Sequence, residues 1–345
     1  MRIPYLPLIL VLLAVFSCTH RQEVRSYDGS IVNECLSDIS TEIIAIPLET
    51  KIECKIENIK QIQGDGVNLF ILNDKNEICH FNYSGNFLNK ISLKNDSSIR
   101  SYTVNKDEEQ IIVLDSLQQL HCYSYHGNKL DQVDISNSPL WRTLYKIVYH
   151  EQSFWMIAEN LTADNHFEKW IYKLDKQFNY QAGVKLCNAD LGRFYLEGYF
   201  SPELSITDGQ IYVYSPLPNK ETILQDTLYL ALNNPLKNDQ ISQLQQSIYT
   251  VPVRMNKRFM IASYQTNCYE KENYLLCYDQ KMNKAYPLHG FKDNFYQTGL
   301  VNDLQALDIF NNQFYFYKSG EEILESFPER NESDNPVLFF VTLKS

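Results

Sequence analysis

Short runs of consecutive apolar residues recur along the chain, and segments rich in Asn, Asp and Ser separate them. Two of these runs are 69–72 and 111–114, and a continuous apolar run of this length is typical of a strand that is buried on both faces. The stretch 78–88 (ICHFNYSGNFL) matches 120–130 (LHCYSYHGNKL) position for position, at an interval of 42 residues. This period predicts a repeat in which each unit is one four-stranded blade.

The repeat unit, laid along the whole chain, predicts six blades. The Asn, Asp and Gly residues between the runs supply the turns. The predicted strands are 59–62, 69–72, 78–82 and 87–93 in blade one, and 102–104, 111–114, 120–124 and 130–135 in blade two. The later copies are degenerate: 144–148, 154–157 and 170–175; 204–206, 211–214 and 227–232; 249–253, 259–262 and 274–279; and 304–310, 314–317 and 337–343.

The two ends of the repeat array complement each other. Blade six runs out of chain after three strands, whereas an apolar strand within 42–49 precedes blade one and has no blade of its own. Ring closure solves both problems, because the N-terminal strand can become the outer strand of the last blade and leave no open end. We therefore predict an all-β fold over residues 42–345, a six-bladed β-propeller closed by its N-terminal strand.

The first 17 residues read as a targeting segment. Arg2 supplies a positive start, and the apolar stretch 5–16 is too short to span a bilayer. The segment ends Val15-Phe16-Ser17-Cys18 and resembles a bacterial lipoprotein box, which implies that Cys18 is lipidated and holds the protein on a membrane. An ordinary secretory signal followed by a chance cysteine is the alternative. Residues 18–41 are polar and are predicted to form a tether.

Several segments together resemble a known family. They are Ile46-Pro47-Leu48-Glu49, the aromatic-Asp or aromatic-Asn pairs that close strands, and the terminal Asp334-Asn335-Pro336-Val337-Leu338. They resemble the six-bladed β-propeller lipoproteins of Bacteroidota over residues 42–345. The resemblance implies a lipid anchor in the cell envelope, at the outer membrane, and says almost nothing about activity. No acidic pair follows Cys18, which leaves the periplasmic and surface faces of the membrane open.

The net charge and the aromatic content limit the kinds of partner that the sequence predicts. The chain carries a net charge of −11 without a basic run, and this acidity repels phosphate backbones, so nucleic acid is not expected as a partner. The 24 Tyr and 18 Phe suit half-buried sheet surfaces. A stacking platform for sugars or bases is the alternative reading of these aromatic residues.

The cysteines show no metal-binding pattern. Eight are present, and without Cys18 seven remain, with neither a C-x-x-C pair nor a zinc-like spacing with His. Cys122 and Cys277 fall at equivalent repeat positions, which predicts small buried residues. Among one or two disulfides in an exported protein, a pair between Cys268 and Cys277 across a hairpin is favoured.

Blades three to six carry extra chain. The predicted loops between second and third strands lengthen at 158–169, 215–226, 263–273 and 318–336, and the segments that lead into blades four to six lengthen at 187–203, 233–247 and 289–303. In a propeller all of these lie on one face, where they would build a recognition surface. Tolerated drift of loop length is the alternative.

The residues at the starts of the inner strands are the candidates for a ligand site at the mouth of the central channel. An Arg, carboxylates and aromatic rings there would hold a polar ligand such as a glycan or peptide. The alternative is that these residues bridge neighbouring blades. The candidates are Arg100, Tyr102, Trp141, Arg142, Tyr199, Glu203, Tyr249 and Asp303.

The sequence contains no strong catalytic motif. The sequence contains no G-x-S-x-G, H-E-x-x-H or phosphate loop. His121, Cys122 and His126 overlie repeat positions of the first copy and are predicted to be structural. Neither a cofactor nor a metal is expected. The sequence predicts a binding or scaffold module for a glycan, peptide or protein partner. The alternative is a divalent-metal-dependent hydrolase or lyase in the channel, for which Glu203 and Asp303 are a thin ligand set.

Overall fold

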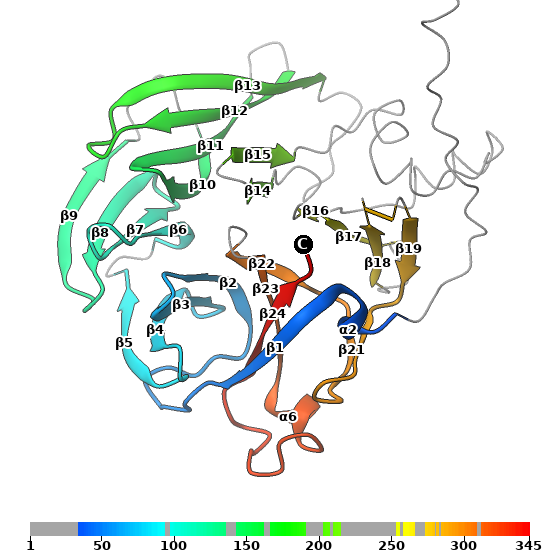
Figure 1. Cartoon of the computed structure of the whole chain (residues 1–345). Coiled ribbons are helices and arrows are strands. Elements are labelled where there is room, and N and C mark those ends of the chain that lie inside the picture. Colours follow the sequence, from blue (N-terminus) through cyan, green and yellow to red (C-terminus); the bar gives the residue numbers. More distant parts are fainter. Residues whose placement is uncertain are drawn as a thin grey trace, which may run out of the picture.

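The protein is described by a computed structural model. It describes residues 34–93, 97–135, 143–161, 166–190, 203–207, 210–214, 253–255, 258–265, 273–279, 281–282, 284–308 and 312–345. Within these residues the chain forms five four-stranded sheets and two two-stranded sheets, all antiparallel. The sheets follow one another round a ring in chain order (Figure 1). The predicted all-β propeller is confirmed.

Three blades lie in the first half of the described chain, and each pairs its strands in sequence order. Blade one contains β2 (Ile59–Gly64), β3 (Asn68–Asn73), β4 (Glu77–Asn82) and β5 (Phe87–Ser92). Blade two contains β6 (Ile99–Asn105), β7 (Gln110–Asp115), β8 (Gln119–Ser124) and β9 (Lys129–Asp134). Blade three contains β10 (Thr143–His150), β11 (Ser153–Leu161), β12 (His166–Leu174) and β13 (Tyr180–Asp190).

The remaining sheets complete the ring. At the position of blade four, β14 (Glu203–Thr207) pairs with β15 (Gln210–Tyr214), and the predicted strand 227–232 lies outside the described residues. Blade five contains β16 (Val253–Met255), β17 (Phe259–Gln265), β18 (Asn273–Asp279) and β19 (Lys284–Leu288). A hairpin of β20 (Phe291–Asp293) and β21 (Gly299–Val301) follows. Blade six contains β22 (Gln305–Asp308), β23 (Gln313–Lys318) and β24 (Val337–Leu343), with the short helix α6 (Gly320–Ile323) after β23.

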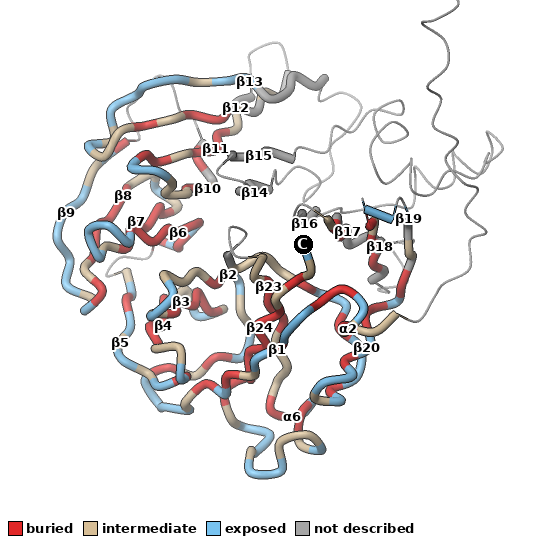
Figure 2. Tube along the Cα trace, in the orientation of Figure 1, coloured by how far each residue is buried: buried red, intermediate tan, exposed pale blue. Residues whose placement is uncertain are grey.

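The hydrophobic cores lie between blades. On β3, Leu69 and Ile71 pack in the cluster shared with blade six, whereas Phe70 and Leu72 pack in the cluster shared with blade two. Two further clusters join blades two and three and blades five and six. The middle strands β3 and β7 are therefore buried on both faces, as the red segments in Figure 2 show. This double burial is the reason that 69–72 and 111–114 are continuous apolar runs.

The Asx residues of the repeat close the third strands. Asn82, Asp175 and Asp279 each accept hydrogen bonds from backbone N–H groups of the turn that follows. This local capping is the physical basis of the aromatic-Asx signature. Burial opposes ionisation of Asp279, but hydrogen bonds from Arg258 and from the turn hold the pKa of its carboxyl below the ordinary value.

The N-terminal strand closes the ring as predicted. The strand β1 (Ser40–Pro47) pairs antiparallel with β24, and the sheet order is β1-β24-β23-β22. The folded domain begins earlier than predicted, because residues 34–41, assigned above to the tether, are part of it. The helix α2 (Leu36–Ile39) buries Leu36 completely, and Lys344 donates to the backbone oxygens of Ser37 and Asp38.

The seam between blades six and one is locked by Asn335, which is fully buried. Its side-chain oxygen accepts from the Ile56 N–H at 2.8 Å, and its amide donates to the backbone oxygens of Glu49 and Cys54, both at 2.8 Å. Thr50 Oγ1 accepts from the Asn335 N–H at 2.9 Å. One side chain thus satisfies three backbone groups of the segment that links β1 to blade one.

The disulfide expectation is wrong. The structure pairs Cys54 with Cys79 and leaves Cys277 as a buried free thiol, so Cys277 does not bond Cys268. The Cys54–Cys79 bond has a Cα–Cα distance of 6.4 Å and ties the segment after β1 to the third strand of blade one. The predicted burial of Cys122 and Cys277 is confirmed.

One of the predicted long loops is mostly strand, and another is strand at its two ends. In blade three, β11 and β12 stay paired as far as Leu161 and Phe167, so most of 158–169 is a hairpin extension. In blade five, β17 and β18 stay paired as far as Gln265 and Asn273. The loop 215–226 and the segment 233–247 lie outside the described residues.

Candidate functional site

The inner strands of blades one, two and three share a bulge. In β2, β6 and β10, the pairing with the next strand shifts by one residue just after the strand begins. The residues that this shift leaves without a partner are Lys60, Arg100 and Tyr145. A bulge redirects the side chain of the extra residue and is found preferentially next to functional sites.

Lys60 and Arg100 lie at the same end of neighbouring inner strands. Lys60 and Arg100 are both exposed, and β2 lies beside both β6 and β22. Asp303, also exposed, lies two residues before β22 begins. We name Lys60, Arg100 and Asp303 the inner-strand mouth. Two cations and one carboxylate therefore lie at the starts of three neighbouring inner strands, β6, β2 and β22.

The side chains of the inner-strand mouth make few bonds within the protein. Arg100 Nη1 donates to the Leu144 oxygen at 3.3 Å, and Lys60 Nζ donates to the Asp74 oxygen at 3.5 Å. Asp303 Oδ2 accepts from Gln305 Nε2 at 2.8 Å. A guanidinium has five N–H donors in a planar fork, so one bond to Leu144 leaves donors for a ligand.

Below the mouth, side chains of one inner strand bond to the backbone of the next. Gln61 and Gln63 both donate to the Tyr102 oxygen, at 3.1 and 2.8 Å, and the Val104 N–H donates to Gln63. Thr103 accepts from the Tyr149 N–H at 2.8 Å in the same way. These bonds hold the inner strands in a fixed relation, so the side chains at the mouth project from a rigid frame.

Tyr102 is not a mouth residue, and its assignment above is corrected. Its side chain is completely buried in the core between blades one and two, and its hydroxyl donates to the Phe70 oxygen at 2.5 Å. Burial raises the pKa of this phenol well above the ordinary value. Tyr102 bridges two blades, as the alternative reading of the candidates expected.

Of the other predicted site residues, three lie within the described residues. Arg100 and Asp303 belong to the inner-strand mouth. Glu203 opens β14 opposite Tyr214. The candidates that lie outside the described residues are Trp141, Arg142, Tyr199, Tyr249 and the lipidation candidate Cys18.

Lys60 is the mouth residue that sequence reasoning missed. Gly64 of β2 pairs with Leu69 of β3, and Val104 of β6 pairs with Ile111 of β7 in the same way. The two inner-strand residues are 40 residues apart, whereas their two partners are 42 residues apart. The turn between the first and second strands is two residues longer in blade two. A strict period of 42 therefore does not align Lys60 with Arg100, its equivalent in the next blade. Alignment of the inner strands by themselves would have found it.

His121, Cys122 and His126 do not form a reactive set. His121 Nε2 lies 2.9 Å from Asp115 Oδ2, and Asp115 also caps the turn after β7. Burial raises the pKa of the Cys122 thiol to about 11, which keeps it protonated in the core between blades two and three. His126 is exposed in the next turn. The side chains therefore point to different surroundings, and His121 has a structural partner.

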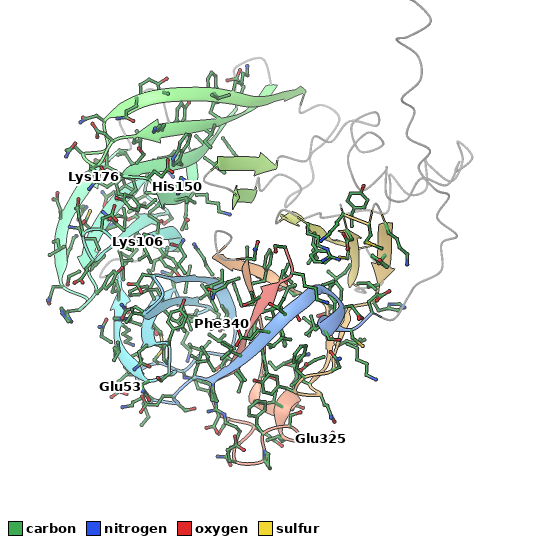
Figure 3. The ribbon with its side chains drawn as sticks, viewed as in Figure 1. Glu53, Lys106, His150, Lys176, Glu325 and Phe340 are labelled. Carbon is green, nitrogen blue, oxygen red and sulfur yellow. A yellow bond between two sulfur atoms is a disulfide. The ribbon has the colours of Figure 1, made fainter. Side chains whose placement is uncertain are left out.

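The extra chain of blade six braces the closing seam. The segment after β23 contacts the hairpin β20–β21, because Lys318 Nζ donates to the Leu300 oxygen at 2.9 Å and Phe327 stacks on Tyr296. Farther along, Thr50 donates to Asp334, and Arg330 donates to the Leu48 oxygen. Much of this segment, near Glu325 in Figure 3, therefore makes contacts within the protein.

The described residues contain no group of three or more His, Cys, Asp or Glu side chains placed to hold a metal ion. In the same part of the chain, no helix combines the length and apolar character needed to cross a bilayer.

Comparison with known proteins agrees with the architecture. Residues 18–314 match the model of a family described as a six-bladed beta-propeller. A solved structure of a protein described as exported, from Bacteroides fragilis, is 17% identical. The match covers 93% of this chain and 98% of that one, with a TM-score of 0.64. At this identity the likeness shows the fold alone.

Other likenesses are weaker. BamB from Moraxella catarrhalis is 8% identical over 88% of this chain and 99% of that one, with a TM-score of 0.41. A protein of unknown function from Bacteroides caccae is 9% identical over 74% of this chain and 80% of that one, with a TM-score of 0.34. Neither supports an argument about this chain. No curated protein matches the chain.

Proposed function

Because the chain belongs to a family of six-bladed beta-propellers, we propose that it is an exported, lipid-anchored binding module whose ligand site is the inner-strand mouth. The ligand is a glycan or peptide that carries an acidic group. The lipid is attached to Cys18, and the protein resides in the bacterial cell envelope, at the outer membrane.

The observation that carries the binding role is the repeated bulge. Lys60 and Arg100 are redirected by the same shift in pairing, in two adjacent strands, and both remain exposed. Because the inner strands are fixed to each other by side-chain bonds, a ligand would find these groups already in place. An arginine fork and a nearby ammonium favour a carboxylate, and Asp303 favours a hydroxyl or amine of the same ligand.

The disulfide supports export. Cys54 and Cys79 lie close enough to bond, and bonds of this kind persist in oxidising compartments outside the cytosol. The apolar segment 5–16 and the Val15-Phe16-Ser17-Cys18 box point to the same destination. The alternative of a metal-dependent hydrolase or lyase has no observation in its favour among the described residues.

Binding is tested with an array of acidic and neutral glycans and peptides, probed with the purified full-length protein. We expect acidic ligands to bind and to bind less at high salt, because the contacts are charged. Lys60→Ala and Arg100→Gln should each weaken binding about tenfold, whereas Lys129→Ala, an exposed lysine on β9, should not. Equal binding by all of these variants would contradict the assignment of the site.

The anchor is tested separately. Cells that express the protein are grown with a labelled fatty acid, and the protein is then isolated from the membrane fraction. We expect label on the wild type and none on Cys18→Ser, which should move to the soluble fraction. Label on both proteins, or on neither, would contradict lipidation of Cys18.

A further inference from the structure

The hairpin β20–β21 has two different faces. Phe291 and Val301 are cross-strand partners and are buried, at 0% and 2% exposure. Lys292 and Leu300 are the next pair, and both are exposed. Phe295, at the turn, is 42% exposed, and Leu300 is 49% exposed. An aliphatic and a cationic side chain therefore share the outer face of this hairpin, and an aromatic side chain is exposed at its turn.

The carboxylate of this hairpin is turned inward. Asp293 is 1% exposed, and it accepts hydrogen bonds from the backbone N–H groups of Phe295, Tyr296 and Thr298 and from the Thr298 hydroxyl. These four bonds shape the turn and hold Phe295 in its exposed position. They also remove the one acidic group of residues 291–301 from the outer surface.

The hairpin is also the point where the N-terminal segment joins the domain. Lys292 N–H donates to the Glu34 oxygen at 2.9 Å, and Cys35 forms a bridge with Lys292. Asn294, next to Phe295, exchanges hydrogen bonds with Ser37. Figure 1 shows β21 beside α2 and on the other side of the ring from β9. About 16 residues separate Glu34 from Cys18, and they reach at most about 55 Å even when fully extended.

From these observations we infer that the outer side of this hairpin, Phe295 with Leu300 and Lys292, rests in the headgroup region of the membrane that the lipid on Cys18 enters. This inference rests on the anchor proposed above. Aromatic and aliphatic side chains beside a lysine suit the interface between lipid tails and water, where the lysine ammonium reaches the headgroups. The tether keeps the hairpin near the bilayer, so a small apolar surface is enough to orient the domain.

The test uses the lipidated full-length protein in phosphatidylcholine vesicles. Tryptophan is introduced by Phe295→Trp and, as the matched control, by Leu130→Trp, an exposed residue on β9. The wild type gives the background of the native tryptophans. Brominated phosphatidylcholine should quench the added fluorescence of Phe295→Trp at least about threefold more than that of Leu130→Trp. Equal quenching of the two would overturn the inference.

Vesicle flotation and light scattering distinguish failure of the anchor, failure of the hairpin contact and burial of the hairpin by a second copy. If the wild type fails to float with the vesicles while Cys18 carries no lipid, both the anchor and the hairpin contact are wrong. If the wild type floats and Phe295→Trp is not quenched, the anchor stands and the hairpin contact is wrong. If light scattering shows a dimer in detergent, and Phe295→Trp emission is already shifted to the blue there, a second copy covers the hairpin, which also overturns the inference.

Discussion

At the scale of single residues, Asn335 shows what a sequence motif contributes to the fold. The sequence marks Asp334-Asn335-Pro336 as part of a family resemblance, but it does not say what the asparagine does. In the fold, its amide satisfies Ile56, Glu49 and Cys54, which lie about 280 residues earlier in the chain. Such a role depends on ring closure, so it could not be predicted until the ends were known to meet.

Asn335→Ala should destabilise the domain strongly. It leaves one buried N–H group and two buried carbonyl groups without partners, at about 1–3 kcal/mol each, so we expect a loss of about 3–5 kcal/mol in the free energy of unfolding. Urea denaturation measures it. Asn128→Ala, at an exposed turn of blade two, is the control and should change the value by less than about 0.5 kcal/mol. Similar values for the two variants would show that Asn335 does not lock the seam.

The Cys54–Cys79 disulfide should stabilise the same seam. It closes a loop with a sequence separation of 25, for which the loss of chain entropy in the unfolded state predicts about 3 kcal/mol. A reducing agent should therefore lower the thermal midpoint of the wild type towards that of Cys54→Ala/Cys79→Ala. The double variant should not respond to the reductant, and a response of similar size in both proteins would assign the effect to other thiols.

Residue-level prediction from the sequence succeeded where a repeat position decides burial, as at Cys122 and Cys277. It failed at Tyr102 and at the disulfide, because a strand start can point a side chain towards the channel or into the neighbouring blade. Cys54 precedes the first repeat unit, so no repeat position constrained it. In each failure, the partner lies outside the residue's own repeat unit.

At the scale of elements, β1 tests the closure most directly. Ile46 is 5% exposed and packs in the core between blades six and one, whereas Ile44 on the same strand is 48% exposed. Ile46→Ala should reduce the free energy of unfolding by about 2–4 kcal/mol through the cavity it leaves. Ile44→Ala should cost less than about 1 kcal/mol, measured by the same urea titration. If both variants cost the same, β1 does not bury the face that its pairing with β24 implies.

Elements were predicted well where apolar runs are bounded by Asx turns, as in blades one and two. They were predicted poorly in blade three, where the polar stretch 158–169 reads as a loop although most of it is paired strand. In a hairpin that extends beyond the core, backbone pairing can hold the strands together without an apolar face. The side chains then need no apolar pattern, and the sequence carries little sign of the strand.

At the scale of the whole molecule, the hydrophobic cores lie at the junctions between neighbouring blades and not inside single blades. Each described cluster draws residues from at least two neighbouring sheets, so a blade cannot bury its faces alone. The ring was predictable because two facts in the sequence, a missing last strand and an unassigned first one, have one common solution. The full set of mouth residues was not predictable, because Lys60 is redirected by a bulge whose place in the repeat the 42-residue period hides.

Deletion of residues 42–49 should therefore destabilise blades far from the cut. The deletion removes most of β1 and opens the junction of blades six and one, and every other blade then loses the constraint of a closed ring. We expect the thermal midpoint to fall by about 8 °C or more, since about 5 kcal/mol or more is lost and each kcal/mol shifts the midpoint of a domain of this size by about 1.5 °C. Fluorescence of Trp155 and Trp170 in blade three should report the same fall as circular dichroism. Deletion of residues 19–33 is the control and should leave the midpoint unchanged. If the 42–49 deletion leaves the unfolding of blade three at the wild-type temperature, the blades do not depend on ring closure.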